Sequence, residues 1–242
     1  MIYSAIYFDD SGTDAGSEIA VASCYLGHVE QWSALSRNWD EINQQEHFGV
    51  FHMADFVGKQ KQFSDWPKAK CDRTIRKLIS VIRTRAEHAF SACIVKDAYD
   101  QYILGDSVLR RKSYKNHYSA AIHMCMAHIA QWRKKRQRLE PIQYVFDQMS
   151  KGRGEIDAMF QTVMSGGVDG LESYGVYGKK LRDGWSFQSK AMVIPLQAVD
   201  IWAYENFRYM RDIVIPHSSA KPRGSYPCPL WITAQCVLSK SH

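Results

Sequence analysis

The sequence is marked first by what it does not contain. No run of about 18 apolar residues occurs, so no segment is expected to cross a bilayer as a helix. The N-terminal residues carry no basic region followed by an apolar stretch, so no secretory leader is expected either. The six cysteines include no C-x-x-C pair, and most fall at apolar positions of expected strands or helices. We therefore expect reduced core thiols, no membrane partner and a cytoplasmic location.

Linkers, internal repeats and low-complexity segments are also lacking. The 242 residues, 45% of them hydrophobic, are enough for one sizeable core. We expect a single domain over residues 1–242, in which a tail from about 213 to 242 covers the domain surface. The formal net charge of +6 is compatible with a nucleic-acid partner without requiring one.

The chain opens with an apolar run that ends in acids. Residues 2–13 read I-Y-S-A-I-Y-F-D-D-S-G-T, which predicts a buried strand followed by a Ser-Gly turn. Asp9 and Asp10 would point to opposite faces of a regular strand. We therefore expect Asp9 to be the functional carboxylate, with Asp10 capping the turn or supporting the site beside Ser11.

Strands and helices are predicted along the rest of the chain. A second apolar run at residues 19–26 favours an antiparallel hairpin with the first. Helices are expected over residues 29–45, from Ser64 or Asp65 through Ile82, and over 113–136, 155–164 and 195–210; strands are expected at 88–95, 142–147 and 185–194. Residues 51–56 are open between a strand and a loop that carries His52 and Asp55 inward. The pattern indicates an α/β fold.

The helix over residues 113–136 ends in a basic run, R-K-K-R-Q-R at 133–138. Basic residues in a last helical turn are favoured by the helix dipole and usually lie on a solvated face. A nucleic-acid footprint is the alternative interpretation.

Three aspartates lie at or near the ends of predicted elements: Asp9 after the first strand, Asp147 after the strand at 142–147, and Asp200 early in the last helix. Acids so placed can converge at one sheet edge, where their mutual repulsion requires cations. One or two Mg²⁺ or Mn²⁺ ions suit such oxygen ligands, and a pair of metal ions suits phosphodiester hydrolysis.

The motifs around these acids resemble a known family. Y-F-D-D-S-G at the first strand, V-F-D at 145–147 and P-L-Q-A-V-D-I-W-A at 195–203 are similar to the family catalogued as domain of unknown function 3800. The resemblance covers the chain to about residue 211. It implies a ribonuclease H-like mixed sheet flanked by helices, with Asp9, Asp147 and Asp200 as catalytic metal ligands. Val199 stands where the family commonly has alanine.

Further residues are candidates for support. A fourth acid is not evident, and Glu41, Glu46 and Asp55 are all possible. His52 is a candidate for proton transfer or phosphate contact, and a buried, hydrogen-bonded histidine is the alternative. Lys190 is a candidate for contact with a scissile phosphate, and an ordinary exposed lysine is the alternative. Gln197 is expected either to orient the surrounding loop or to form a hydrogen bond with the neighbouring backbone.

The leading hypothesis is a metal-dependent nuclease acting on RNA or DNA. An inactive nucleic-acid or protein binding module on the same fold is the alternative. A haloacid-dehalogenase-like phosphatase is a weaker one, because its D-x-D-G-T loop places two carboxylates two residues apart, whereas Asp9 and Asp10 are adjacent.

Overall fold

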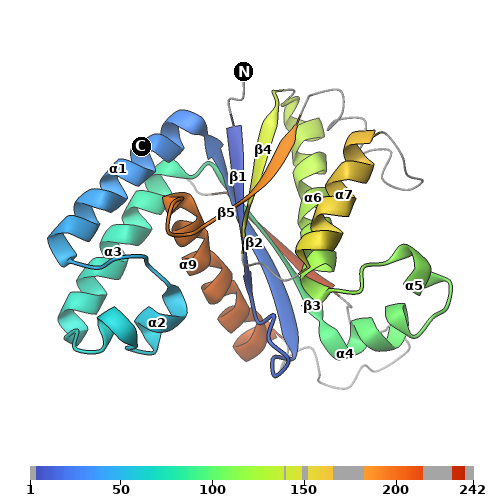
Figure 1. Ribbon diagram of the computed structural model, residues 1–242, viewed down its shortest axis with the longest axis horizontal. Helices are drawn as coiled ribbons and strands as arrows, with labels where there is room; N and C mark the ends of the chain where they lie inside the picture. The colour runs from blue at the N-terminus through green and yellow to red at the C-terminus, as the bar shows by residue number, and fades with distance from the viewer. Residues whose placement is uncertain (1–3, 139, 149–151, 166–182, 215–230, 238–242) are drawn as a thin grey trace.

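Six strands form one mixed sheet in the order β5-β4-β1-β2-β3-β6 (Figure 1). The computed structural model describes residues 4–138, 140–148, 152–165, 183–214 and 231–237, and the description below is confined to them. The strands are β1 (Ser4–Ser11), β2 (Ile19–His28), β3 (His88–Val95), β4 (Ile142–Asp147), β5 (Gly184–Gln188) and β6 (Trp231–Val237). β1 pairs antiparallel with β2 and parallel with β4, so the predicted opening hairpin is confirmed.

Helices cover both faces of the sheet (Figure 1). The longer ones are α1 (Val29–Glu46), α3 (Lys68–Arg85), α6 (His117–Arg136), α7 (Arg153–Ser165) and α9 (Ile194–Tyr209). α1, α3 and α9 share one apolar cluster with the sheet, whereas α6 and α7 share another on the opposite face. The shorter elements are α2 (Met53–Val57), η1 (Lys61–Phe63), α4 (Lys96–Tyr99), η2 (Asp100–Leu104), α5 (Leu109–Lys112) and η3 (Met210–Val214).

Side-chain alternation along β1 divides the core into these two layers. Ile6 and Phe8 point to the α6 side, whereas Ala5 and Tyr7 point to the α9 side. Asp9 has the same parity as Ala5 and Tyr7. The alternation of the strand therefore directs the Asp9 carboxylate toward α9.

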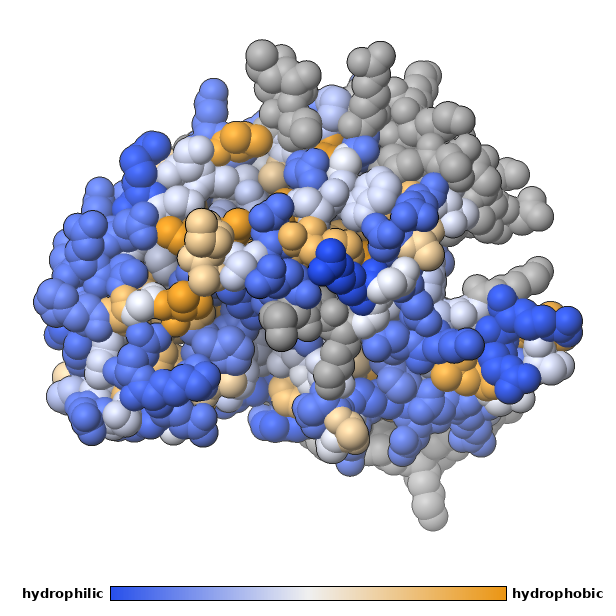
Figure 2. Space-filling view, viewed as in Figure 1, coloured by the Kyte–Doolittle hydropathy of each residue, from blue (hydrophilic) through white to orange (hydrophobic). Residues whose placement is uncertain are grey.

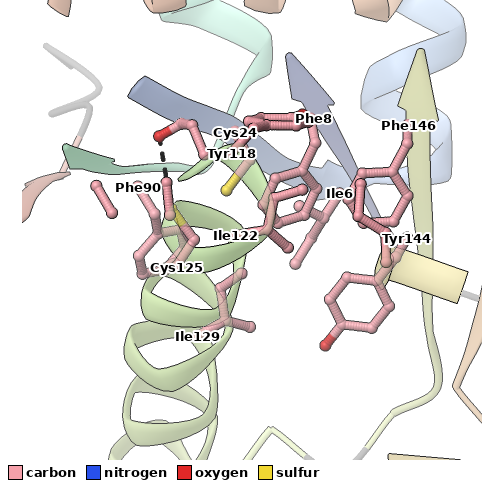
Figure 3. Packing of buried hydrophobic residues seen from close by; sticks show 14 of the residues in the cluster. Ile6, Phe8, Cys24, Phe90, Tyr118, Ile122, Cys125, Ile129, Tyr144 and Phe146 are labelled. Atoms are coloured by element: carbon pink, nitrogen blue, oxygen red, sulfur yellow. Dashed lines mark hydrogen bonds between the residues drawn. The ribbon is translucent and has the colours of Figure 1, made fainter. Parts of the chain in front are cut away.

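The α6 side of the core is densely packed (Figure 3). Ile122 and Cys125 of α6 point toward the strand residues Phe8, Cys24 and Phe90, all of them at most 1% exposed. Each fully buried side chain of this size contributes about 1.5–3 kcal/mol. This packing holds the strands rigidly, so the residues at their ends have fixed positions.

Several predicted boundaries are corrected by the structure. Residues 51–56 form neither a strand nor only a loop, because the short helix α2 starts at Met53. The helix predicted from 113 starts at His117, where the Asn116 side chain accepts hydrogen bonds from the N–H groups of Tyr118 and Ser119. β5 ends at Gln188, so the predicted strand to residue 194 is too long.

Two further differences concern the ends of elements. α3 starts at Lys68 with Pro67 as its N-cap residue, later than the predicted start at Ser64 or Asp65. Within the tail expected to cover the surface, residues Trp231–Val237 form β6, which pairs antiparallel with β3 and adds an edge strand to the sheet. The remaining tail residues, 215–230 and 238–242, lie outside the described residues.

Across the described ranges, no helix has both the length and the apolar composition needed to span a membrane.

Glu46 at the end of α1 gives a test of helix packing. Its buried carboxylate accepts hydrogen bonds from Arg73 and Lys77 of α3, and these hold its pKa at about 2 against a usual 4.5. Because the pKa is lowered in the folded state, this stabilisation is present above pH 4.5 and is lost as the pH falls through about 2.

We expect Glu46→Gln to lower the free energy of unfolding at pH 7, because it removes the negative charge that Arg73 and Lys77 contact. The loss should be only about 1–2 kcal/mol, because both cations are partly exposed and solvent screens their attraction. Urea denaturation measures the change. The matched control is Asp72→Asn, which removes an exposed pair with Lys68 and should cost little. Equal stability of wild type and Glu46→Gln at pH 7 would contradict the assigned role.

Candidate active site

Two of the predicted acids lie at the same edge of the sheet. β1 and β4 are parallel neighbours, with Phe8 opposite Phe146, so Asp9 and Asp147 follow at adjacent positions. Phe146 points to the α6 side, and Asp147 therefore points with Asp9 to the α9 side. The register of two parallel strands thus places two carboxylates side by side.

The third acid arrives from α9, which packs against β1 and β2. Asp200 lies in the second turn of α9 and is 5% exposed. One of its carboxylate oxygens accepts a hydrogen bond from the backbone N–H of Met53, at the start of α2. The segment between β2 and β3 therefore fixes the orientation of Asp200.

Lys190 lies at the centre of the three carboxylates. Its Nζ is 2.7 Å from Oδ2 of Asp9, 3.1 Å from Oδ1 of Asp200 and 3.6 Å from Oδ2 of Asp147. The side chain is only 15% exposed. The structure thus brings the three predicted acids together around one ammonium group, which neutralises part of their charge.

This arrangement shifts the pKa values of its members. Burial raises the pKa of Asp9 well above its usual range, although Lys190 opposes the rise. Burial also acts to raise the pKa of Asp200, but Lys190, His52 and hydrogen bonds from Asp9 and the Met53 N–H outweigh it, so this pKa is lowered. The closely placed pair therefore holds a proton on Asp9 more readily than on Asp200.

The ammonium group is held in its charged form. Burial alone would lower the pKa of Lys190, but the attraction of Asp9, Asp200 and Asp147 raises it above its usual value. The three carboxylates therefore favour the charged form of Lys190.

Gln197 connects the segments around the site. Its Oε1 accepts a hydrogen bond of 2.9 Å from the backbone N–H of Phe51, and its Nε2 donates one of 2.8 Å to the carbonyl of Lys190. The side chain is 4% exposed. Gln197 therefore joins the turn that carries Lys190 to the segment that carries His52.

The turn after β1 forms one wall of the site. The Asp10 carboxylate accepts a hydrogen bond of 2.5 Å from Thr13 Oγ1, so Asp10 closes the turn that the sequence indicated. Burial raises the pKa of Asp10, and this hydrogen bond opposes the rise. Gly12 has a φ of 69°, and a Cβ there would lie 2.3 Å from the Phe207 ring, so only glycine fits.

A cleft of about 440 Å³ opens onto these groups. Its lining includes Asp10, Ser11 and His52 as well as the three acids and Lys190; Tyr204 and Phe207 of α9 complete one side. The His52 side chain is 45% exposed, with Nε2 3.7 Å from Oδ1 of Asp200. His52 thus lies at the mouth of the cleft beside Asp200.

The candidates for a fourth acid do not lie in the cleft. Glu46 pairs with Arg73 and Lys77 between α1 and α3, and Glu41 is exposed on α1. Asp55 pairs with Lys61 at 2.8 Å, and its Oδ2 is 4.0 Å from Nδ1 of His52. Asp55 therefore contacts the site only through His52.

Oxygen donors in a buried cleft are the ligands that Mg²⁺ and Mn²⁺ prefer, so the three carboxylates have the appropriate chemistry. In the described part of the chain, however, no set of three or more His, Cys, Asp or Glu side chains is arranged to hold a metal ion. The distances from Nζ of Lys190 to the carboxylate oxygens of Asp9 and Asp200 are those of ion pairs. They are longer than the 2.0–2.1 Å that separates Mg²⁺ from an oxygen ligand. The donor set fits a metal ion, whereas its present spacing fits an ammonium group.

Two features of the site are not predicted by the sequence: the position of Lys190 at the centre of the acids, and the hydrogen bond from the Met53 N–H to Asp200. Tyr204 lies four residues after Asp200, a helical spacing that signals a shared face. The backbone N–H of Met53 leaves no signal in the sequence.

No protein-family model, curated protein or solved structure matches the chain. The proposed function therefore rests on the geometry of the site.

Lys190→Met tests the electrostatic structure of the site. The substitution leaves three closely placed carboxylates without their cation, so we expect the free energy of unfolding at pH 7 to fall by about 3 kcal/mol. The loss should shrink as the pH is lowered, because protonation removes the repulsion. Chemical denaturation in a chelating buffer measures both effects.

The matched control is Lys61→Met, which removes a lysine paired with Asp55 alone and 74% exposed. Its cost should stay below about 1 kcal/mol. Similar costs for the two variants would contradict a central position for Lys190.

Proposed function

We propose that the protein is a divalent-metal-dependent nuclease that hydrolyses phosphodiester bonds in RNA or DNA on a ribonuclease H-like sheet. The main observation behind this proposal is that Asp9, Asp147 and Asp200 come from three separate elements and meet at one place. Each has a carboxylate oxygen within 3.6 Å of the buried Nζ of Lys190. Buried acids that meet in this way are costly to maintain, so a function that uses them explains the arrangement.

The fold supports this proposal through its topology. An antiparallel hairpin is followed by helices alternating with parallel strands, which is the order that the family resemblance implies. Ligands of α/β sheets bind outside the carboxyl ends of the strands. The cleft lies at that edge beside β1 and β4.

Asp9, Asp147 and Asp200 would hold one or two Mg²⁺ or Mn²⁺ ions. Such ions, when bound, supply an activated water and stabilise the charged oxygens of a phosphodiester. The positive charge that Lys190 now provides would then be redundant among the acids. Lys190 lies in the turn that the hydrogen bond from the Met192 N–H to the Ser189 carbonyl closes, and its side chain lines the cleft, so it would face a phosphate bound there.

His52 and Gln197 have separate tasks in this proposal. His52, at the mouth of the cleft and beside Asp200, is positioned to move a proton between solvent and a reacting oxygen. Through its two hydrogen bonds, Gln197 holds the segment that contains His52 in a fixed position relative to the turn that contains Lys190. It is therefore a positioning residue.

One observation favours a binding module as the second candidate. Lys190 offsets part of the charge of the acids, and the raised pKa of Asp9 favours a proton on that carboxylate, so the site can be stabilised without a metal ion. The phosphatase alternative has less support, because Asp9 and Asp10 are adjacent rather than two residues apart, and because the strand β2 follows the turn.

Hydrolysis of a panel of single- and double-stranded RNA and DNA in Mg²⁺ or Mn²⁺ tests the proposal. We expect Asp9→Asn and Asp147→Asn each to reduce the rate at least about 100-fold, because each removes a charged oxygen ligand. Asp72→Asn, which changes an exposed aspartate on α3, should retain full activity. Inactivity of the wild type on the whole panel would lead us to abandon the nuclease.

Calorimetric titration with Mn²⁺ separates the two candidates. A nuclease should bind the ion, and Lys190→Met should bind it more tightly than wild type because no ammonium group competes. Asp147→Asn should bind it more weakly. Binding of nucleic acid without detectable Mn²⁺ binding in either wild type or Lys190→Met would favour the binding module.

A further inference from the structure

Two groups of basic residues lie at opposite ends of α6. The first, which we call the near cluster, consists of Arg110, Arg111 and Lys115, just before the helix. The second, the far cluster, consists of Lys134, Lys135 and Arg136 in its last turn. All six side chains are exposed. α6 has 20 residues, so the clusters are separated by about 30 Å along the helix.

The near cluster belongs to the edge of the sheet that carries the acids. β1 and β3 both pair antiparallel with β2, so they run in the same direction and end at one edge. The chain leaves β3 at Lys96, whose Nζ donates a hydrogen bond to the carbonyl of Asp14 in the turn after β1. Residues 96–116 therefore form a lobe at the edge where Asp9 lies (Figure 1).

This lobe is fastened beside the end of β4. The Glu155 carboxylate, in the first turn of α7, accepts hydrogen bonds from the backbone N–H groups of Lys115 and Asn116. α7 begins at Arg153, a few residues after Asp147. The near cluster is thus held next to the strand that supplies an acid.

The far cluster lies at the opposite edge, where β4 and β5 begin. Arg133 forms a buried ion pair with Asp183, just before β5, and donates a hydrogen bond to the carbonyl of Glu140, just before β4. Arg138 pairs with Glu87 and Glu140. Two of the basic residues in the 133–138 run therefore stabilise the fold, and the remaining three are exposed.

The near cluster also has the composition of a nucleic-acid surface. Within the described ranges, Arg110, Arg111 and Lys115 form no ion pair with a carboxylate. Exposed apolar side chains accompany them, since Tyr102 is 49% exposed and Val108 is 56% exposed. Figure 2 shows hydrophilic and apolar atoms mixed on this lobe. Cations interleaved with an exposed aromatic ring suit phosphates and unstacked bases together.

We propose that the near cluster, and not the far cluster, binds the phosphate backbone of nucleic acid and leads it to the acid cleft. This inference rests on the proposed nuclease function, because the edge position of the cluster matters only if the substrate reaches Asp9 and Asp147. Of the two basic groups, only the near cluster shares the carboxyl edge of the sheet with the acids.

The test compares two variants with the same change in charge. The near variant is Arg110→Gln, Arg111→Gln, Lys115→Gln, and the far variant is Lys134→Gln, Lys135→Gln, Arg136→Gln. Fluorescence anisotropy measures their affinity for short labelled single-stranded RNA and DNA in EDTA, where cleavage does not occur. Thermal unfolding verifies that both variants remain folded.

We expect the near variant to bind at least about tenfold more weakly than wild type, and the far variant to bind within about twofold. The slope of log Kd against log salt should decrease by roughly 0.7–0.9 for each phosphate that the near variant no longer neutralises. Equal reductions in affinity for the two variants, or a larger reduction for the far variant, would overturn the assignment.

Failure of this inference is distinguishable from failure of the nuclease. If only the near variant binds more weakly and wild type cleaves nothing, the binding surface is supported and the nuclease proposal is rejected. If wild type cleaves nucleic acid and the two variants bind with equal affinity, the nuclease proposal is supported and the binding surface is rejected. If unfolding disables the near variant, the single substitution Arg110→Gln should still weaken binding more than Lys135→Gln.

Discussion

Asp9, Asp147 and Asp200 lie around a single ammonium group, and the arrangement of the chain near the cleft depends on this contact. Three buried carboxylates without a cation would repel one another and would each lose hydration. Lys190, at 2.7–3.6 Å from all three, offsets that cost. The turn between β5 and α9 must therefore lie against the ends of β1 and β4, and α9 must dock with Asp200 facing inward.

The segment between β2 and β3 completes this arrangement. Its backbone donates hydrogen bonds from Phe51 to Gln197 and from Met53 to Asp200, and these are two of the polar side chains that α9 buries. The same segment carries His52 to the mouth of the cleft. One stretch of chain thus forms hydrogen bonds with the buried side chains of Gln197 and Asp200 and also supplies His52. The same segment therefore contributes to the stability of the region and to its proposed chemistry.

The two edges of the sheet carry different charged groups. At the edge where β4 and β5 begin, Arg133 and Asp183 form a buried ion pair that fastens α6 to the sheet. The acids and the cleft lie at the edge where β1 and β4 end, and the lobe that carries the near cluster follows the end of β3 at the same edge. Cations on this lobe would attract a polyanion, which the carboxylates by themselves would repel.

The sequence by itself determined the opening hairpin and the approximate extent of the main helices, because apolar periodicity records which face each element buries. It also placed Asp9 and Asp147 at strand ends, since both follow apolar runs. Only the tertiary structure decided that Lys190 lies among the acids and that Glu46 pairs elsewhere. It also decided that the basic run at 133–138 lies at the other edge. These relations join residues as many as 181 positions apart, and local spacing carries no record of such contacts.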